Sequence, residues 1–176
     1  EDRSMRLRDY VLERLEKEGI DTAFSLFGGA ISELMNAFPR QKKIRYVCTQ
    51  HEQAAGFAAE GYAKVKGIPG LAIATSGPGG GNLVTPIQNC YYDSTPCIFI
   101  TGQVQIRFIH RKGERQLGFQ ETPIVDIVRP ITKYACQPRS VADARDMLEE
   151  AIAACMTGRR GPVLIDIPID VQKLEM

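Results

Sequence analysis

Residues 46–64 read YVCTQHEQAAGFAAEGYAK, in which a short apolar run changes into a stretch rich in alanine and glycine. The apolar run at 46–48 predicts the end of a buried strand, and residues 53–64 predict a closely packed helix. Glu52 lies at the junction between them. The carboxyl end of a strand is where open α/β sheets bind their ligands. Glu52 is therefore interpreted either as a helix cap or as a proton-handling group.

Apolar runs and helical patterns alternate on both sides of this junction. The patterns predict strands near residues 23–27, 44–48, 71–75, 97–101, 131–136 and 163–167, and helices near 5–18, 30–38, 53–66, 83–92, 123–128 and 140–157. The polar segment 103–121 predicts a long loop. Because the strands are too apolar to have a wet face, we expect an α/β fold with a six-stranded, mostly parallel sheet and helices on both faces. Residues 1–176 are expected to form one domain.

The bulk composition favours a small-molecule or protein partner. The net charge of the 176 residues is +1 and no basic stripe is present, which argues against nucleic acid. The longest apolar runs are too short to span a membrane. The five cysteines are odd in number and form no CxxC pair. They indicate reduced thiols and a cytoplasmic location, and no metal site is predicted.

A glycine-rich stretch, TSGPGGGN at residues 75–82, follows one predicted strand. Its backbone N–H groups could bind an anion or a ring edge, although a tight turn is the plainer alternative. No lysine follows, so it is not a Walker A loop. A dinucleotide fingerprint would need a third glycine where Asn82 stands, and an acid after the next strand. Nicotinamide binding is therefore the weaker interpretation.

Thr49 and Glu52 have the spacing of a capping box, in which each side chain satisfies a backbone N–H of the other residue. On spacing alone this helix cap is the simpler interpretation of Glu52. A cap and a ligand-binding role do not exclude each other.

Longer motifs change that balance. They are QHEQAAGFAAEGYAK at 50–64, TSGPGGGNLVTPIQNCYYDSTPCIFITGQV at 75–104, GFQETPIVDIVRPITKYA at 118–135 and GPVLIDIPIDVQ at 161–172. Together they resemble the pyrimidine-binding domain of thiamine-diphosphate enzymes, and most closely the acetolactate synthase group. The resemblance extends over residues 6–172 and implies the same α/β fold.

The resemblance implies roles for particular residues. Glu52 matches the glutamate that hydrogen-bonds N1′ of the aminopyrimidine ring, through which thiamine diphosphate activates itself for decarboxylation and carboligation of 2-keto acids. Pro78 and Asn82 match residues on and near that ring, in the loop that also contains Gly77 and Gly79. Gln120 matches a glutamine near the reacting end of the cofactor.

The two histidines of the chain lie in different contexts. His51 matches the histidine beside the family's glutamate, although a polar group at a helix start is an equally good interpretation. His110 lies in the variable loop and is given no role.

Some positions depart from the family pattern. Leu26 and Phe27 stand where the family has Tyr-Pro, so the contact of that tyrosine is in doubt. The segment before Gln120 is longer than in biosynthetic acetolactate synthases, and it looks like relatives from polysaccharide or nucleotide-sugar pathways. The choice of 2-keto acid is therefore left open, and bound FAD is not assumed.

The family's central domain and its diphosphate-binding domain, which binds Mg²⁺, have no counterpart in this sequence. Asp93 and Asp126 lack the context of the Gly-Asp-Gly motif that binds the metal. We therefore expect the chain to be catalytically incomplete alone, to need a diphosphate-binding domain or subunit, and to form a homo-oligomer. The alternatives are a non-catalytic assembly or regulatory module of the same fold, and a nicotinamide-binding domain.

Overall fold

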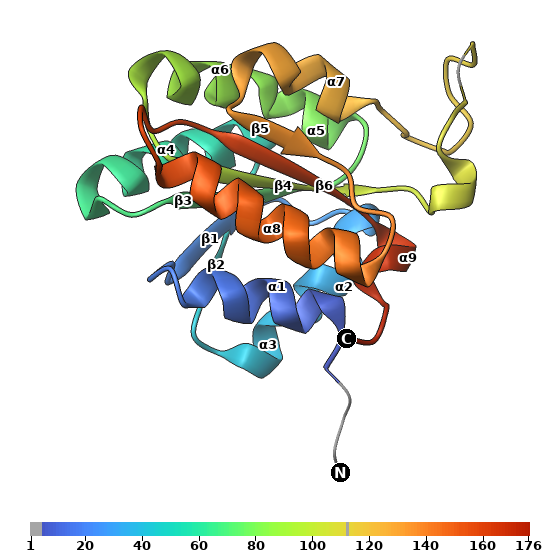
Figure 1. Ribbon diagram of the computed structural model, residues 1–176, viewed down its shortest axis with the longest axis horizontal. Helices are drawn as coiled ribbons and strands as arrows, with labels where there is room; N and C mark the ends of the chain where they lie inside the picture. Colours follow the sequence, from blue (N-terminus) through green and yellow to red (C-terminus); the bar gives the residue numbers. More distant parts are fainter. Residues whose placement is uncertain (1–4, 112) are drawn as a thin grey trace.

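The computed structural model describes residues 5–111 and 113–176. Its centre is one sheet of six parallel strands in the order β2-β1-β3-β4-β6-β5 (Figure 1). The strands are β1 (Thr22–Ser25), β2 (Arg45–Cys48), β3 (Gly70–Ala74), β4 (Cys97–Gln103), β5 (Tyr134–Cys136) and β6 (Val163–Pro168). The predicted six-stranded α/β fold is confirmed, with every strand pairing within the sheet parallel.

Helices cover both faces of the sheet (Figure 1). One face carries α4 (Glu52–Lys66), α5 (Pro78–Asn82), α6 (Val84–Asp93) and α7 (Ile124–Val128). The other carries α1 (Leu7–Glu16), α2 (Ser32–Met35), α3 (Phe38–Gln41), α8 (Val141–Met156) and α9 (Ile169–Gln172). Short 3₁₀ turns are η1 (Gly29–Ile31), η2 (Ile106–Phe108) and η3 (Arg129–Ile131). No helix in the described part of the chain is long and apolar enough to cross a membrane.

The alternation of side chains along the strands divides the interior into two cores. On β3, Leu71 and Ile73 belong to the core under α1 and α8, whereas Ala72 and Ala74 belong to the core under α4 and α6. The first core consists mainly of leucine and isoleucine. The second is built around small side chains, among them Ala59 and Ala63 of α4, so this helix lies close to the sheet.

Close backbone approaches and a buried carboxylate fix the position of α4. Gly56 packs against the ring of Pro86, and Gly70 of β3 packs against the backbone of Ala59. Glu60 is buried and accepts hydrogen bonds of 2.8 and 2.9 Å from Nδ2 of Asn89 on α6. Helix α4 is therefore held against β3 and α6 through its residues 56–60.

The structure corrects the prediction of a buried strand at residues 46–48. The strand order places β2 at an edge of the sheet, where Cys48 is exposed and Tyr46 and Val47 are only partly buried. Periodicity cannot distinguish an edge strand from a central one when both are apolar.

The glycine-rich stretch contains a turn at residues 76–77, but the helical structure after it begins earlier than the predicted residue 83. Residues Pro78–Asn82 form the short helix α5, which is followed directly by α6. Pro78 occupies the first helical position, where its fixed φ suits a helix and its missing N–H is not needed. Gly77, with φ +63°, makes the sharp change of direction from the strand.

Candidate functional site

Glu52 is the first residue of α4, and His51 is the N-cap. His51 has extended backbone angles, and its Nδ1 accepts a 3.1 Å hydrogen bond from the backbone N–H of Gln53. The predicted capping box between Thr49 and Glu52 is therefore wrong, because the helix begins too late for Thr49 to cap it. The interpretation of His51 as a polar group at the helix start is confirmed.

The Glu52 carboxylate is directed away from the helix backbone and towards α5. The residue is 7% exposed, and its Oε2 accepts a 2.9 Å hydrogen bond from Nδ2 of Asn82. Oε1 has no hydrogen-bond partner among the described residues. It lies beside Gly79, where a Cβ would be 3.4 Å from this oxygen. Asn82 thus orients the carboxylate and leaves one oxygen available to a ligand.

Gly77, the residue before α5, packs against the segment that contains Gln120. A Cβ at Gly77 would lie 2.6 Å from the backbone oxygen of Gln120, so only glycine permits this approach. Gln120 itself has φ +57°, which is uncommon for a residue with a side chain. Pro78 is exposed on the outer side of this turn.

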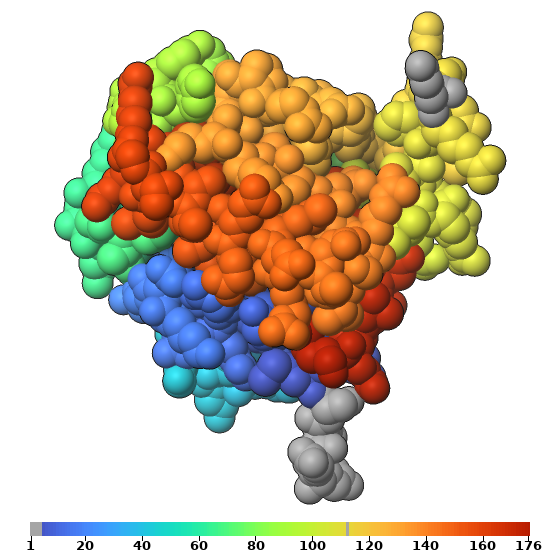
Figure 2. All heavy atoms as spheres, in the orientation of Figure 1, coloured from blue at the N-terminus to red at the C-terminus, as the bar shows by residue number. Residues whose placement is uncertain are grey.

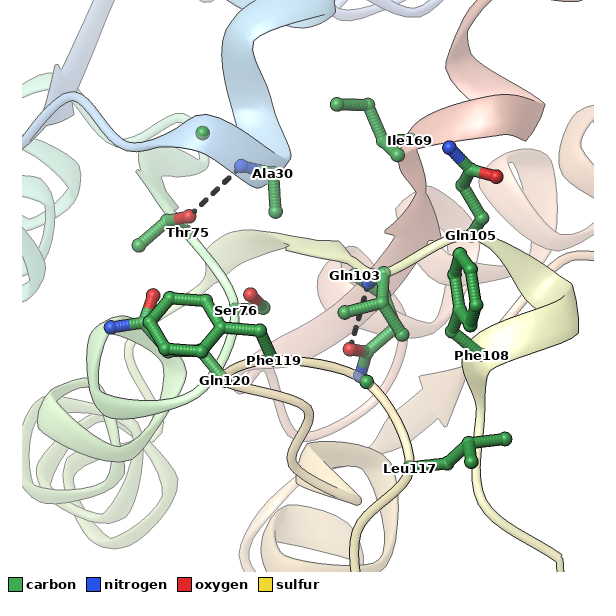
Figure 3. Close-up of a pocket in the computed structure, with 13 residues that line it drawn as sticks. Ala30, Thr75, Ser76, Gln103, Gln105, Phe108, Leu117, Phe119, Gln120 and Ile169 are labelled. Atoms are coloured by element: carbon green, nitrogen blue, oxygen red, sulfur yellow. Dashed lines mark hydrogen bonds between the residues drawn. The ribbon is translucent and has the colours of Figure 1, made fainter.

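A cavity of about 560 Å³ opens beside Gly77, at the carboxyl ends of β3 and β4 (Figure 3). Ala30 and Thr75 lie on one side of it and Phe108 and Leu117 on the other, and Thr75 Oγ1 accepts a 3.2 Å hydrogen bond from the Ala30 N–H. Its lining is Gly29, Ala30, Thr75, Ser76, Gln103, Val104, Gln105, Phe108, Leu117, Gly118, Phe119, Gln120 and Ile169.

The position of this cavity follows from the strand order. The connections from β1 and β3 diverge at the carboxyl edge of the sheet, because β2 and β4 lie on opposite sides of this pair. Ligands of open α/β sheets bind at such a switch point.

The structure brings the predicted site residues together in two groups. Asn82 binds one oxygen of the Glu52 carboxylate and Gly79 lies beside the other, with Pro78 in the same helical turn. Gln120 lines the cavity and contacts Gly77, which joins the two groups. Their roles in binding and catalysis remain predictions.

Sequence reasoning missed the cavity residues Ser76 and Gln103 and the buried Asp166. Asp166 is fully buried on β6 and accepts hydrogen bonds from Oγ1 of Thr101 (2.7 Å) and from Nε2 of Gln103 (3.0 Å) and Gln137 (2.7 Å). Asp166 therefore holds Gln103 at the cavity wall. Polar residues at the ends of apolar strands were a usable signal for Gln103, but the contact with Asp166 depends on tertiary structure.

Burial raises the pKa of Asp166 to about 6, although hydrogen bonds from Thr101, Gln137 and Gln103 oppose the shift. The pKa of Asp166 in the folded chain is therefore above its unfolded value of about 3.8. Asp166 stabilises the fold fully only below about pH 3.8, and this contribution to stability is lost as the pH rises through about 6. We expect wild type to lose about 2 kcal/mol relative to Asp166→Asn between about pH 4.5 and about pH 7.5. Urea unfolding of both proteins across this range measures the difference, and parallel pH curves would contradict it.

No group of three or more His, Cys, Asp or Glu side chains with the arrangement of a metal site occurs within residues 5–111 and 113–176. Asp93 pairs with Lys64 at 2.8 Å and Asp126 with Arg129 at 3.1 Å. Both aspartates therefore lie in surface ion pairs.

Comparison with known proteins places this geometry in a family context. Residues 5–127 match the family described as thiamine pyrophosphate enzyme, N-terminal TPP binding domain. The chain is 46% identical over 165 residues to the chloroplastic acetolactate synthase of Arabidopsis thaliana, with 94% of this chain and 24% of that protein aligned. It is 43% identical over 169 residues to the acetolactate synthase large subunit of Corynebacterium glutamicum, with 94% of this chain and 26% of that protein aligned. The chain thus spans about a quarter of the length of these relatives.

Proposed function

This chain belongs to the thiamine pyrophosphate enzymes, as their N-terminal TPP binding domain, and from this premise we propose that it forms the aminopyrimidine-binding half of an active site acting on 2-keto acids. The observation that carries the proposal is the Glu52 carboxylate, which is buried, oriented by Asn82 and available at Oε1. The similarity to acetolactate synthases supports decarboxylation and carboligation as the reaction type.

The residues around Glu52 fit an aminopyrimidine ring. A ring nitrogen that carries a proton donates a hydrogen bond to an acceptor, and Oε1 of Glu52 is an acceptor with no described partner of its own. A Cβ at Gly79 would lie 2.8 Å from Cγ2 of Thr75 and 3.4 Å from this oxygen, so glycine lets α5 lie close to the carboxylate. Thiamine diphosphate, when bound, supplies the electron sink for cleavage of the bond between the carboxylate and the keto carbon.

The chain's own residues would then have separate tasks. Glu52 holds a proton at Oε1, shared with N1′ of the ring, while Asn82 fixes the other carboxylate oxygen through its 2.9 Å hydrogen bond. Gln120, at the cavity, positions the substrate near the reacting end of the cofactor. A buried carboxylate that is held in one orientation within hydrogen-bond reach of a ring nitrogen can transfer a proton.

The cavity supports a small substrate with oxygen acceptors. Gln105 and Gln120 supply amide groups to a lining that also contains Phe108 and Leu117. Amide N–H groups can donate to the carboxylate and keto oxygens of a 2-keto acid. Bound FAD is not part of the proposal, because no residue of this chain is assigned to it.

The rest of the active site would come from a partner domain or subunit, which would hold the diphosphate through Mg²⁺. Exposed aromatic side chains near the site support such a partner, since Phe119 is 85% exposed and Phe27 is 61% exposed. We also propose a homo-oligomer. The five cysteines, all free, support the reducing cytoplasm as the compartment.

Calorimetric titration of the complete enzyme with thiamine diphosphate and Mg²⁺ tests the proposal. We expect thiamine diphosphate to bind and pyruvate or another 2-keto acid to be turned over. At a ligand concentration of about 100 Kd, binding is expected to raise the free energy of unfolding by about 2.7 kcal/mol. Binding without turnover of any 2-keto acid would contradict the proposed reaction. No binding would favour an assembly module, and binding of NAD instead would favour a nicotinamide domain.

A further inference from the structure

The connection between β4 and α7, residues 104–123, forms one wall of the cavity from two separate stretches. Val104, Gln105 and Phe108 come from its first part, and residues 117–120 come from its second part. A Cβ at Gly118 would lie 3.0 Å from the backbone oxygen of Phe108 and from the methyl groups of Val104. The two stretches are therefore in direct contact, and the described residues between them, 109–111 and 113–116, extend outward at one corner of the molecule (Figure 2).

A single carboxylate ties the two stretches together. The Glu121 side chain is 1% exposed, and its Oε1 accepts a 2.8 Å hydrogen bond from the backbone N–H of His110 and contacts Nδ1 of the same histidine. Its Oε2 accepts from the backbone N–H groups of Leu117 (2.9 Å) and Gly118 (3.3 Å). Both carboxylate oxygens are thus used, one at each end of the outward excursion.

The environment keeps this carboxylate charged. Burial acts to raise the pKa of Glu121, but the backbone N–H groups of Leu117, His110 and Gly118 and the His110 side chain together lower it below its usual value. Hydrogen bonds to an ionised acceptor are stronger than neutral ones. Loss of the charge would therefore weaken several contacts of the wall together.

Gln120 shows why such a clamp is needed. Its φ of +57° lies in the left-handed region, which a residue with a side chain adopts only when its surroundings enforce it. Gly77 packs against its backbone on one side, and Glu121 fixes the chain immediately after it. These contacts hold the Gln120 side chain at the cavity.

We propose that Glu121 is a positioning residue, which clamps residues 110 and 117–118 together and so shapes the wall that presents Phe119 and Gln120 to the substrate. The proposal rests on the proposed function, because it identifies the cavity with the substrate site. It gives Glu121 no contact with substrate or cofactor.

Glu121→Gln in the complete enzyme tests the clamp. The introduced NH₂ group would face backbone N–H donors, so at least one bond is lost. We expect hydrogen exchange of the Leu117 and Gly118 amides to accelerate about tenfold, which corresponds to the loss of one hydrogen bond to a charged acceptor. The KM for the 2-keto acid is expected to rise about tenfold with a smaller change in kcat, because a displaced wall weakens substrate binding.

Glu114→Gln is the matched control, because Glu114 also accepts a backbone hydrogen bond within the connection, from the Arg111 N–H at 2.8 Å, but does not line the cavity. It is expected to leave both readouts unchanged. His110→Ala removes only one side-chain contact, so it serves as a milder second variant if Glu121→Gln does not fold. We expect it to accelerate exchange of the same amides about threefold.

Unchanged amide exchange in the folded variants would overturn the clamp. A fall in kcat with an unchanged KM would overturn its role at the substrate wall. If the wild-type enzyme neither binds thiamine diphosphate nor turns over a 2-keto acid, the proposed function fails and with it the link to substrate. The exchange experiment still decides whether Glu121 holds the wall.

Discussion

Glu52→Gln, introduced into the complete enzyme, is expected to lower kcat by about 10²–10³-fold, within the range for loss of a general acid–base group. Glutamine has almost the same size as glutamate, and its amide oxygen can still accept the hydrogen bond from Asn82. Its amide nitrogen, however, cannot hold and return a proton at the position of Oε1. The fold is therefore retained while proton exchange with the aminopyrimidine is lost.

Steady-state turnover at saturating thiamine diphosphate measures this effect, and the best control lies in the same helix. Glu60 is also a buried carboxylate of α4, and it also accepts from an asparagine amide, that of Asn89. Glu60→Gln is expected to change kcat by less than about threefold, since Glu60 is part of the packing between α4 and α6. Equal turnover by wild type and Glu52→Gln would refute the role of Glu52.

Gly70→Ala is expected to destabilise the chain by about 3 kcal/mol, at the upper end of the range for overpacking. Its Cβ would lie 2.6 Å from the carbonyl carbon of Ala59 and closer still to the carbonyl oxygen. The obstacle is helix backbone, so no side-chain rotation relieves it. Helix α4 would have to move away from β3, and the packing of small side chains beneath it would be lost.

Gly61→Ala provides the matched control in α4, because a Cβ at Gly61 meets nothing within 4 Å. This substitution is expected to stabilise the chain by about 0.5–1 kcal/mol, since alanine favours a helix over glycine. Urea unfolding of the three proteins measures both changes. If Gly70→Ala unfolds at the same urea concentration as wild type, the close approach of α4 to the sheet is not as described.

The fold could be predicted from the sequence because its signals are local. Each strand is a short apolar run, each long helix has its own periodicity, and Ser140 caps α8 by accepting from the Asp143 N–H at 3.1 Å. Position within the sheet is not a local property. For that reason, the sequence predicts a buried strand where the structure has the edge strand β2.

The candidate site could be predicted only in part. The motifs pointed to Glu52, Asn82 and Gln120, but the hydrogen bond that makes one oxygen of Glu52 available joins residues that are 30 positions apart. The spacing points to Thr49 as the N-cap of α4, because the extended backbone that makes His51 the cap is not visible in the sequence.

The cavity wall arises from a connection that composition could describe only as a loop. Glu121 bonds to backbone N–H groups, which every residue other than proline possesses. No side-chain pattern can therefore reveal its partners.

The two cores of this domain imply opposite tolerances to substitution. Under α1 and α8 the interior is filled by large aliphatic side chains, so positions such as Leu71 and Ile73 suffer mainly from substitutions that leave a hole. Under α4 the interior contains Ala59, Ala63, Ala72 and Ala74. Replacing one of these side chains by a smaller one removes little volume, whereas a larger one would overpack the core. At these four positions beneath the helix that begins with Glu52, only small residues are therefore expected to fit, whereas the opposite core is expected to accept the exchange of one large aliphatic residue for another.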